Sequence, residues 1–167
     1  MRLSKLLATI SLSMVFGSEL AGAEDYVFED YDKGFEAYKL GDYEAALVEW
    51  LPLAQQGNGD ALYWIAVLYD DGRGVPESDK EAVKWYVLSA AQGIAEAQYR
   101  LGEMHYNGTG VLKDYKRAYM WYALSVYNEF SPAKHLRDRV GSVLTVTEAA
   151  KAREMARRCL ESDYTDC

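Results

Sequence analysis

The stretch Gly108-Thr109-Gly110-Val111, followed by Trp121-Tyr122, occurs twice in this chain of 167 residues. Moving back by 36 positions leads to Gly72-Arg73-Gly74-Val75 and then to Trp85-Tyr86. Repeats of this length are typical of helical solenoids, in which each unit is a pair of helices. The sequence therefore predicts an all-α fold, a right-handed α-solenoid of helical hairpins. The same offset pairs residues around the motifs, among them Tyr63 with Tyr99, Ala82 with Ala118, and Ser89 with Ser125.

An earlier segment has the same helical pattern with a shorter loop. Tyr43, Ala46, Leu47 and Trp50 recur at three- and four-residue spacing, which indicates one face of an amphipathic helix. Small residues that allow close helix contact lie 12 positions apart in this hairpin and 16 apart in the next two, so the later hairpins have four extra loop residues. The predicted repeats are residues 27–57, 60–93 and 96–130, approximately.

The extra loop residues hold the Gly-x-Gly-Val motif, whose glycines permit backbone conformations that other residues resist. Ser78, with Glu81 three residues later, and Asp114 are predicted to cap the helices that follow these loops. Neither loop ends in Gly-Lys-Ser/Thr or follows a strand pattern, so a phosphate-binding loop is not indicated.

Residues 131–167 are predicted to form a closing pair of helices that covers the end of the stack. Ser131-Pro132 has the pattern of an N-cap followed by proline at the first helical position. Thr145 and Glu148 have the spacing of a capping box and predict the start of the last helix.

The first residues have the pattern of a secretory signal peptide. Arg2 and Lys5 precede an uncharged run from Leu6 to Phe16, and Ala21-Gly22-Ala23 places small residues before a cut. We expect residues 1–23 to be removed, leaving a single exported domain over 24–167 in the periplasm or outside the cell. The apolar run is too short to span a bilayer, so no membrane insertion is expected after cleavage.

The cysteines and the charge fit this expectation. An oxidising compartment favours a disulfide between Cys159 and Cys167, although free thiols or a redox pair are alternatives.

Without residues 1–23 the chain has 16 basic and 25 acidic residues, a formal charge of −9. Such a charge disfavours binding to nucleic acid or anionic lipid. His105 and His135 lie far apart, so no metal or cofactor is expected.

The later two hairpins resemble the Sel-one-like repeat, a relative of the tetratricopeptide repeat. The resemblance is carried by Leu101-Gly102, Met104, the Gly-x-Gly-Val motif, Asp114, Ala118 and Trp121-Tyr122. It implies a noncatalytic scaffold or regulator that binds a protein, such as an envelope sensor, an assembly factor or a host protein. The family pattern places the candidate partner-binding residues on the concave side of the first helices: Tyr63, Val67, Asp70, Tyr99, Glu103 and Tyr106.

Two other functions remain as alternatives. Ser131-Pro132-Ala133-Lys134 matches the Ser-x-x-Lys of penicillin-interacting enzymes, and a cysteine-rich branch of the family has been linked to β-lactam hydrolysis. The chain lacks the Ser-Asp-Asn and Lys-Thr-Gly motifs that accompany that serine, and it lacks cysteine pairs within the repeats. A β-lactam or cell-wall hydrolase is therefore the weaker hypothesis, and a glycan-binding envelope assembly protein is the third.

Overall fold

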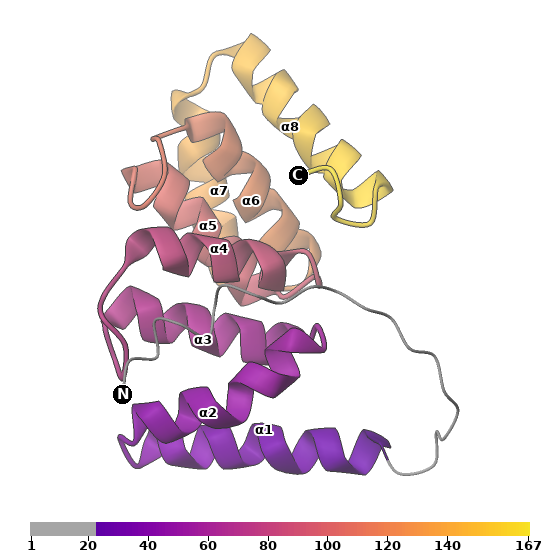
Figure 1. Cartoon of the computed structure of the whole chain (residues 1–167). Coiled ribbons are helices and arrows are strands. Elements are labelled where there is room, and N and C mark those ends of the chain that lie inside the picture. Colours follow the sequence, from indigo (N-terminus) through magenta and orange to yellow (C-terminus); the bar gives the residue numbers. More distant parts are fainter. Residues whose placement is uncertain (1–22) are drawn as a thin grey trace.

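The computed structural model describes residues 23–167, with side chains from residue 31 onward. The predicted signal peptide therefore lies outside the described residues, apart from Ala23. Within the described range the chain forms eight α helices (Figure 1). They are α1 (Ala23–Lys39), α2 (Tyr43–Gln55), α3 (Gly59–Asp71), α4 (Asp79–Ala90), α5 (Ala95–Asn107), α6 (Tyr115–Tyr127), α7 (Pro132–Val143) and α8 (Val146–Glu161).

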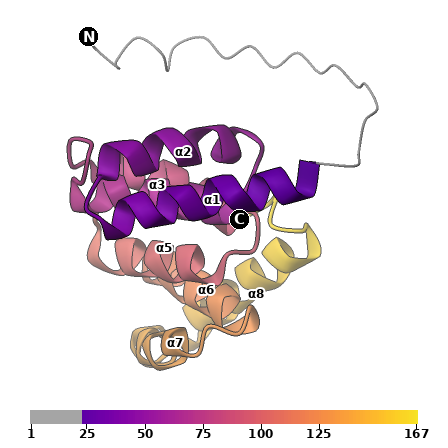
Figure 2. The ribbon, with the colours of Figure 1, turned by 90° about the horizontal axis from the view of Figure 1, so that it is seen from below.

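Six of these helices form three hairpins that stack in chain order. α1 packs with α2, α3 with α4 and α5 with α6, and neighbouring hairpins meet through α2 against α3 and α4 against α5. Figures 1 and 2 show the stack running from α1 and α2 at one end to α7 and α8 at the other. This arrangement is the α-solenoid that the 36-residue offset predicts.

The loops inside the hairpins differ in length as the repeat spacing predicts. Residues 40–42 join α1 to α2, whereas residues 72–78 and 108–114 join the helices of the next two hairpins. Gly72 and Gly108 end α3 and α5 in the left-handed conformation, with φ of 64° and 83°. The predicted caps follow, because Ser78 and Asp114 accept backbone hydrogen bonds at the starts of α4 and α6.

The second glycine of each long loop contacts the preceding hairpin. A Cβ atom on Gly74 would lie 2.8 Å from Tyr43, at the start of α2. A Cβ atom on Gly110 would lie 2.6 Å from the carbonyl oxygen of Asp79, at the start of α4. Tyr43 and Asp79 are 36 residues apart, so the same contact occurs twice. The motif thus fixes how each hairpin sits on the one before it.

A hydrogen bond also recurs at the repeat offset. The Ser89 hydroxyl donates to the carbonyl oxygen of Gly59 at 2.8 Å, and the Ser125 hydroxyl donates to that of Ala95 at 2.7 Å. Each bond ties the end of a second helix to the start of the first helix in the same hairpin. The repeated serine is therefore a structural residue of the repeat.

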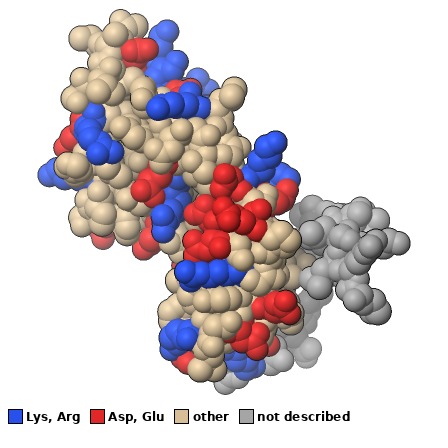
Figure 3. Space-filling model, turned by 90° about the vertical axis from the view of Figure 1, so that its left-hand side faces the viewer, with Lys and Arg blue, Asp and Glu red and all other residues tan. Residues whose placement is uncertain are grey.

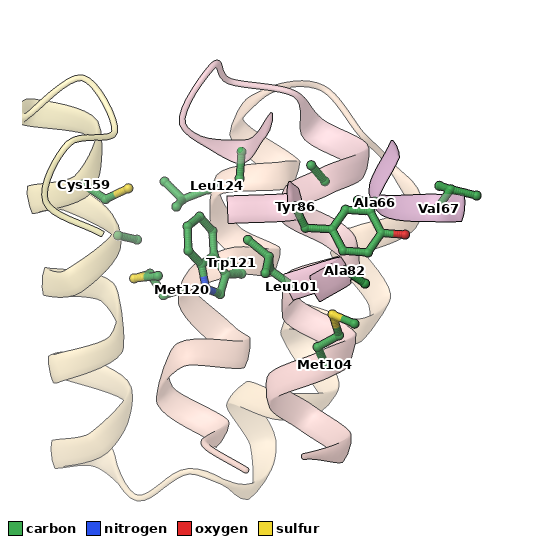
Figure 4. Close-up of a cluster of buried hydrophobic side chains, with 13 residues drawn as sticks. Ala66, Val67, Ala82, Tyr86, Leu101, Met104, Met120, Trp121, Leu124 and Cys159 are labelled. Atoms are coloured by element: carbon green, nitrogen blue, oxygen red, sulfur yellow. The ribbon is translucent and has the colours of Figure 1, made fainter. Parts of the chain in front are cut away.

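The core continues along the stack between the two rows of helices. Figure 4 shows part of it, where Tyr86, Leu101 and Trp121 lie among small and aliphatic side chains. Close packing explains the small residues of the repeat, since a Cβ atom on Gly102 would lie 2.6 Å from the Tyr122 ring. Trp85 is half-buried and packs at the edges of two core clusters.

The last two helices lie on two sides of α6 instead of packing as a hairpin. α7 starts with proline as predicted, but the Ser131 side chain makes no capping bond, because its backbone is already helical. α8 starts with the predicted capping box of Thr145 and Glu148. The structure joins Cys159, on α8, to Cys167, and their Cα atoms lie 4.8 Å apart.

Candidate functional site

The candidate partner-binding residues lie on two helices of the same row, α3 and α5. Tyr63, Asp70, Tyr99, Glu103 and Tyr106 are half-buried, so each presents part of its side chain to solvent. The prediction that Val67 contacts a partner is wrong: only 8% of Val67 is exposed, and it belongs to the main core cluster. Val67 faces the core because one face of α3 must bury its apolar side chains against α4.

Arg100 joins the residues of α3 and α5. Its guanidinium contacts Glu103 with an Nη1 to Oε2 distance of 3.2 Å, and its charge interacts with the Tyr63 hydroxyl of α3. The Tyr99 hydroxyl donates to the other Glu103 oxygen at 3.1 Å. Burial disfavours the charged form of Arg100, but its neighbours Tyr86, Tyr63 and Glu103 outweigh that effect and raise the pKa of the guanidinium. A cation is therefore held in the middle of this face.

Asp70 is a partly buried carboxylate at the end of α3. Its Oδ2 atom accepts a hydrogen bond of 3.2 Å from the Tyr86 hydroxyl. Burial raises the pKa of Asp70, and the like charges of Asp71 and Asp79 add to the shift, while Tyr86 and Arg100 oppose it. The pKa of Tyr86 is also raised, mainly by burial and then by Asp70, so Tyr86 stays a hydrogen-bond donor.

These groups border an open pocket of about 240 Å³ between α3, α5 and the loop after α5. Two candidate residues, Asp70 and Glu103, line it. Sequence reasoning missed the other lining residues: Arg100, Met104, Asn107 and Thr109. The sequence does contain one signal for Arg100: it is the one arginine or lysine in the two helices α3 and α5.

The pocket presents mainly charged and polar groups. Two carboxylates, a guanidinium, an amide and a hydroxyl can hydrogen-bond the polar groups of a bound chain. Figure 3 shows acidic side chains gathered near the middle of the face that carries the loops between paired helices. The arrangement suits recognition of a polar segment with positive groups near Asp70.

Among the described residues, no group of three His, Cys, Asp or Glu side chains is placed to hold a metal ion. None of the described helices combines the length and apolar character needed to cross a bilayer. The serine of the hydrolase hypothesis, Ser131, is exposed at the start of α7 and does not line the pocket.

The fold and the face on α3 and α5 define the protein as an α-solenoid of helical repeats. Residues 59–94 and 95–128 each match the Sel1 repeat family. The chain therefore carries two Sel1 repeats, formed by α3 with α4 and by α5 with α6. Proteins with such repeats generally mediate protein–protein interaction.

Solved structures share this fold. The protective antigen c5321 of uropathogenic Escherichia coli, described as displaying an SLR fold, matches with a TM-score of 0.77 and 23% identity, covering 85% of this chain and 32% of that chain. A Sel1 repeat protein from Oxalobacter formigenes matches with a TM-score of 0.65 and 29% identity, covering 77% of this chain and 55% of that one.

A curated relative is similar over a shorter stretch. An exopolysaccharide production negative regulator of Rhizobium leguminosarum bv. viciae is 37% identical over 59 residues, which is 35% of this chain and 22% of the relative. The chain thus spans about a fifth of that relative, about a third of one solved chain and just over half of the other.

Proposed function

We propose that this protein is an exported, noncatalytic scaffold or regulator that holds a protein partner on the row of first helices, around the Asp70 pocket. The observation that carries the proposal is the pocket itself, whose polar groups come from two successive repeats and remain open to solvent. Half-exposed tyrosines flank it and offer contact area with a polar tip, as in many protein interfaces.

Asp70 provides a further argument for a bound partner. Its raised pKa means that the folded protein disfavours the ionised carboxylate. A positive group of a partner beside Asp70 would favour the ionised form and lower that pKa. Asp70 is therefore a group whose environment improves when a cationic segment binds.

Export is the second part of the proposal. It is supported by the signal-peptide pattern of residues 1–23, with the expected cut beside the first residue of α1. In an oxidising compartment, the bond between Cys159 and Cys167 would persist. The regulator named among the relatives is in keeping with a regulatory role, although it shares only a short stretch with this chain.

The proposal is tested by capture of partners from native envelope extract with the purified protein as bait. Asp70→Asn combined with Glu103→Gln removes two charges from the pocket while leaving acceptors for the Tyr86 and Tyr99 hydroxyls. We expect this double variant to lose at least about tenfold in capture, because buried polar contacts in an interface depend on charge complementarity. The melting temperature should stay the same or rise, since ionised Asp70 is disfavoured in the fold.

A matched control removes the same charge elsewhere. Glu44→Gln with Glu154→Gln changes two exposed side chains on α2 and α8, and should capture as much as the parent. If the pocket variant and this control both capture the parent's partners at parental levels, the pocket is not the binding site. If capture and melting temperature fall together, the pocket residues act in folding instead.

A further inference from the structure

Charge is divided unevenly along the stack. Residues 24–110 have 17 acidic and 6 basic side chains, a formal charge of −11. Residues 111–153 have 4 acidic and 8 basic side chains, a formal charge of +4. The second range contains α6, α7, the start of α8 and most of the loop before α6. This acidic protein therefore has a basic region at one end of its stack.

Two cations of that region converge on one tyrosine of α5. The Lys113 ammonium lies 5.8 Å from the centre of the Tyr106 ring, and the Arg139 guanidinium lies 5.2 Å from it. Lys113 also lies 5.1 Å from the ring centre of Tyr115, which is 5.4 Å from that of Tyr106. Both cations are exposed to solvent. We call these four residues the cationic tyrosine patch.

Three of the four carboxylates of this region are engaged by other groups. Asp114 caps α6 through two backbone N–H groups, and Glu148 closes the capping box of α8. Asp138 pairs with Arg137 at 2.7 Å. In the part of the chain with described side chains, no ion pair reaches either cation of the patch. Lys113 and Arg139 thus form no ion pair with the described side chains.

The patch continues the face that contains the Asp70 pocket. Tyr106 follows Glu103 by one helical turn on α5. Arg139, on α7, acts electrostatically on the hydroxyls of both Tyr99 and Tyr122, so its charge reaches the same row of tyrosines. One extended segment could therefore contact the pocket and the patch together.

We infer that the cationic tyrosine patch binds the carboxylates of an acidic segment in the protein partner; this inference rests on the proposed function. Charge-assisted hydrogen bonds from Lys113 and Arg139 hold the carboxylates, while the rings of Tyr106 and Tyr115 contact the apolar stems of the same side chains. The bound segment then runs in one direction, with positive groups near Asp70 and negative groups near Arg139.

The test uses nuclear magnetic resonance of the purified, isotope-labelled protein with two synthetic probes. One is a capped peptide of six residues rich in Glu and Asp, and the other has Gln and Asn in their places. We expect the acidic peptide alone to shift the backbone amide signals of Lys113, Tyr115 and Arg139. Lys113→Gln with Arg139→Gln should weaken its binding about tenfold, since each exposed charge pair contributes a few-fold. Arg153→Gln, an exposed change on α8, should leave the affinity unchanged.

Three outcomes would overturn the inference. The first is the absence of amide shifts at the patch with the acidic peptide. The second is inorganic phosphate shifting the same amides and binding as tightly as the peptide, which would make the patch a site for small anions. The third is undiminished capture of the native partner by the Lys113→Gln, Arg139→Gln variant. If the Asp70→Asn, Glu103→Gln variant loses that partner at the same time, the proposed function stands while this inference fails.

Discussion

At the scale of single residues, His105 occupies a tyrosine position of the repeat and is 9% exposed. Its Nδ1 atom has no hydrogen-bond partner among the described residues. Burial lowers the pKa of His105, and the nearby Arg117 lowers it further, while a backbone bond to Leu112 and the charge of Asp114 oppose the shift. The imidazole is therefore neutral in the folded protein near neutral pH.

This pKa makes stability depend on pH in a defined direction. Because the folded pKa lies below the unfolded one, the unfolded chain binds more protons once the pH falls below the ordinary histidine value of about 6.5. The free energy of unfolding should therefore fall as the pH decreases from 7 toward 5. His105→Tyr, which restores the residue type of Tyr69 in the preceding repeat, should reduce that fall. Urea unfolding at several pH values measures the difference.

An exposed histidine supplies the control for this experiment. His135→Gln, on α7, should leave the pH dependence as it is in the parent protein. If the parent and His105→Tyr lose stability equally on acidification, then His105 is not the group responsible.

The sequence predicts part of the site at this scale. The 36-residue offset pairs Tyr63 with Tyr99, and the repeat pattern places them with Asp70, Glu103 and Tyr106 on α3 and α5. Arg100 was missed because its role depends on reaching across to Tyr63 on the neighbouring first helix. The prediction for Val67 was wrong because the repeat pattern predicts which helices line the concave side. It does not predict which residues of those helices point into the core.

At the scale of elements, the Gly-x-Gly loops act as spacers between hairpins. Their first glycines end α3 and α5, and their second glycines touch the start of the preceding second helix. The motif thus has a structural explanation that does not require a ligand. The second loop also borders the pocket, because Thr109 lies between its two glycines and lines the pocket.

Substitution of Gly110 tests this role. Gly110→Ala places a Cβ atom 2.6 Å from the Asp79 carbonyl oxygen at a φ of 69°. We expect a loss of about 2 kcal/mol or more, from backbone strain and from the displacement of the loop. Gly41 has a φ of 81°, and a Cβ atom there would meet no atom within 4 Å. Gly41→Ala therefore measures the backbone strain alone and should lower the free energy of unfolding by less, about 1 kcal/mol. Equal losses in urea unfolding would mean that the loop contact contributes nothing.

The C-terminal elements were predicted in part. The proline predicts where α7 begins and the capping box predicts where α8 begins. Neither signal predicts that the two helices pack on different sides of α6. That arrangement depends on contacts distant in sequence. One is the pair of hydrogen bonds between the side chains of Tyr164 and Asn128, at 2.9 and 3.0 Å. Another is the burial of Cys159 against the core residues of α6.

The disulfide of this segment makes a separate prediction. Cys159→Ser with Cys167→Ser should lower the free energy of unfolding by about 2 to 3 kcal/mol, because the bond closes a loop in the unfolded chain. The measurement is urea unfolding of the parent and the variant, with reduced parent as the control that should match the variant. A parent protein isolated from native envelope with two titratable thiols would contradict the proposed oxidising location.

At the scale of the whole molecule, the formal charge changes sign along the stack, from −11 over residues 24–110 to +4 over residues 111–153. The acidic range 24–110 includes Asp70 and Glu103, and the basic range 111–153 includes Lys113 and Arg139. This division requires no detailed geometry and could have been read from the sequence. The convergence of both cations on Tyr106 could not, because it depends on the placement of α7 beside α5 and α6.

The central claim is that a protein partner lies on the row of first helices. It is tested most directly by placing a photo-crosslinking amino acid at Asn107, on the exposed rim of the pocket, in cells that naturally make the protein. A second version carries the same group at Val87, an exposed residue of α4 outside the pocket. We predict a discrete covalent adduct with another protein from position 107 and none from position 87. Adducts from 87 alone, or from neither position, would contradict the claim.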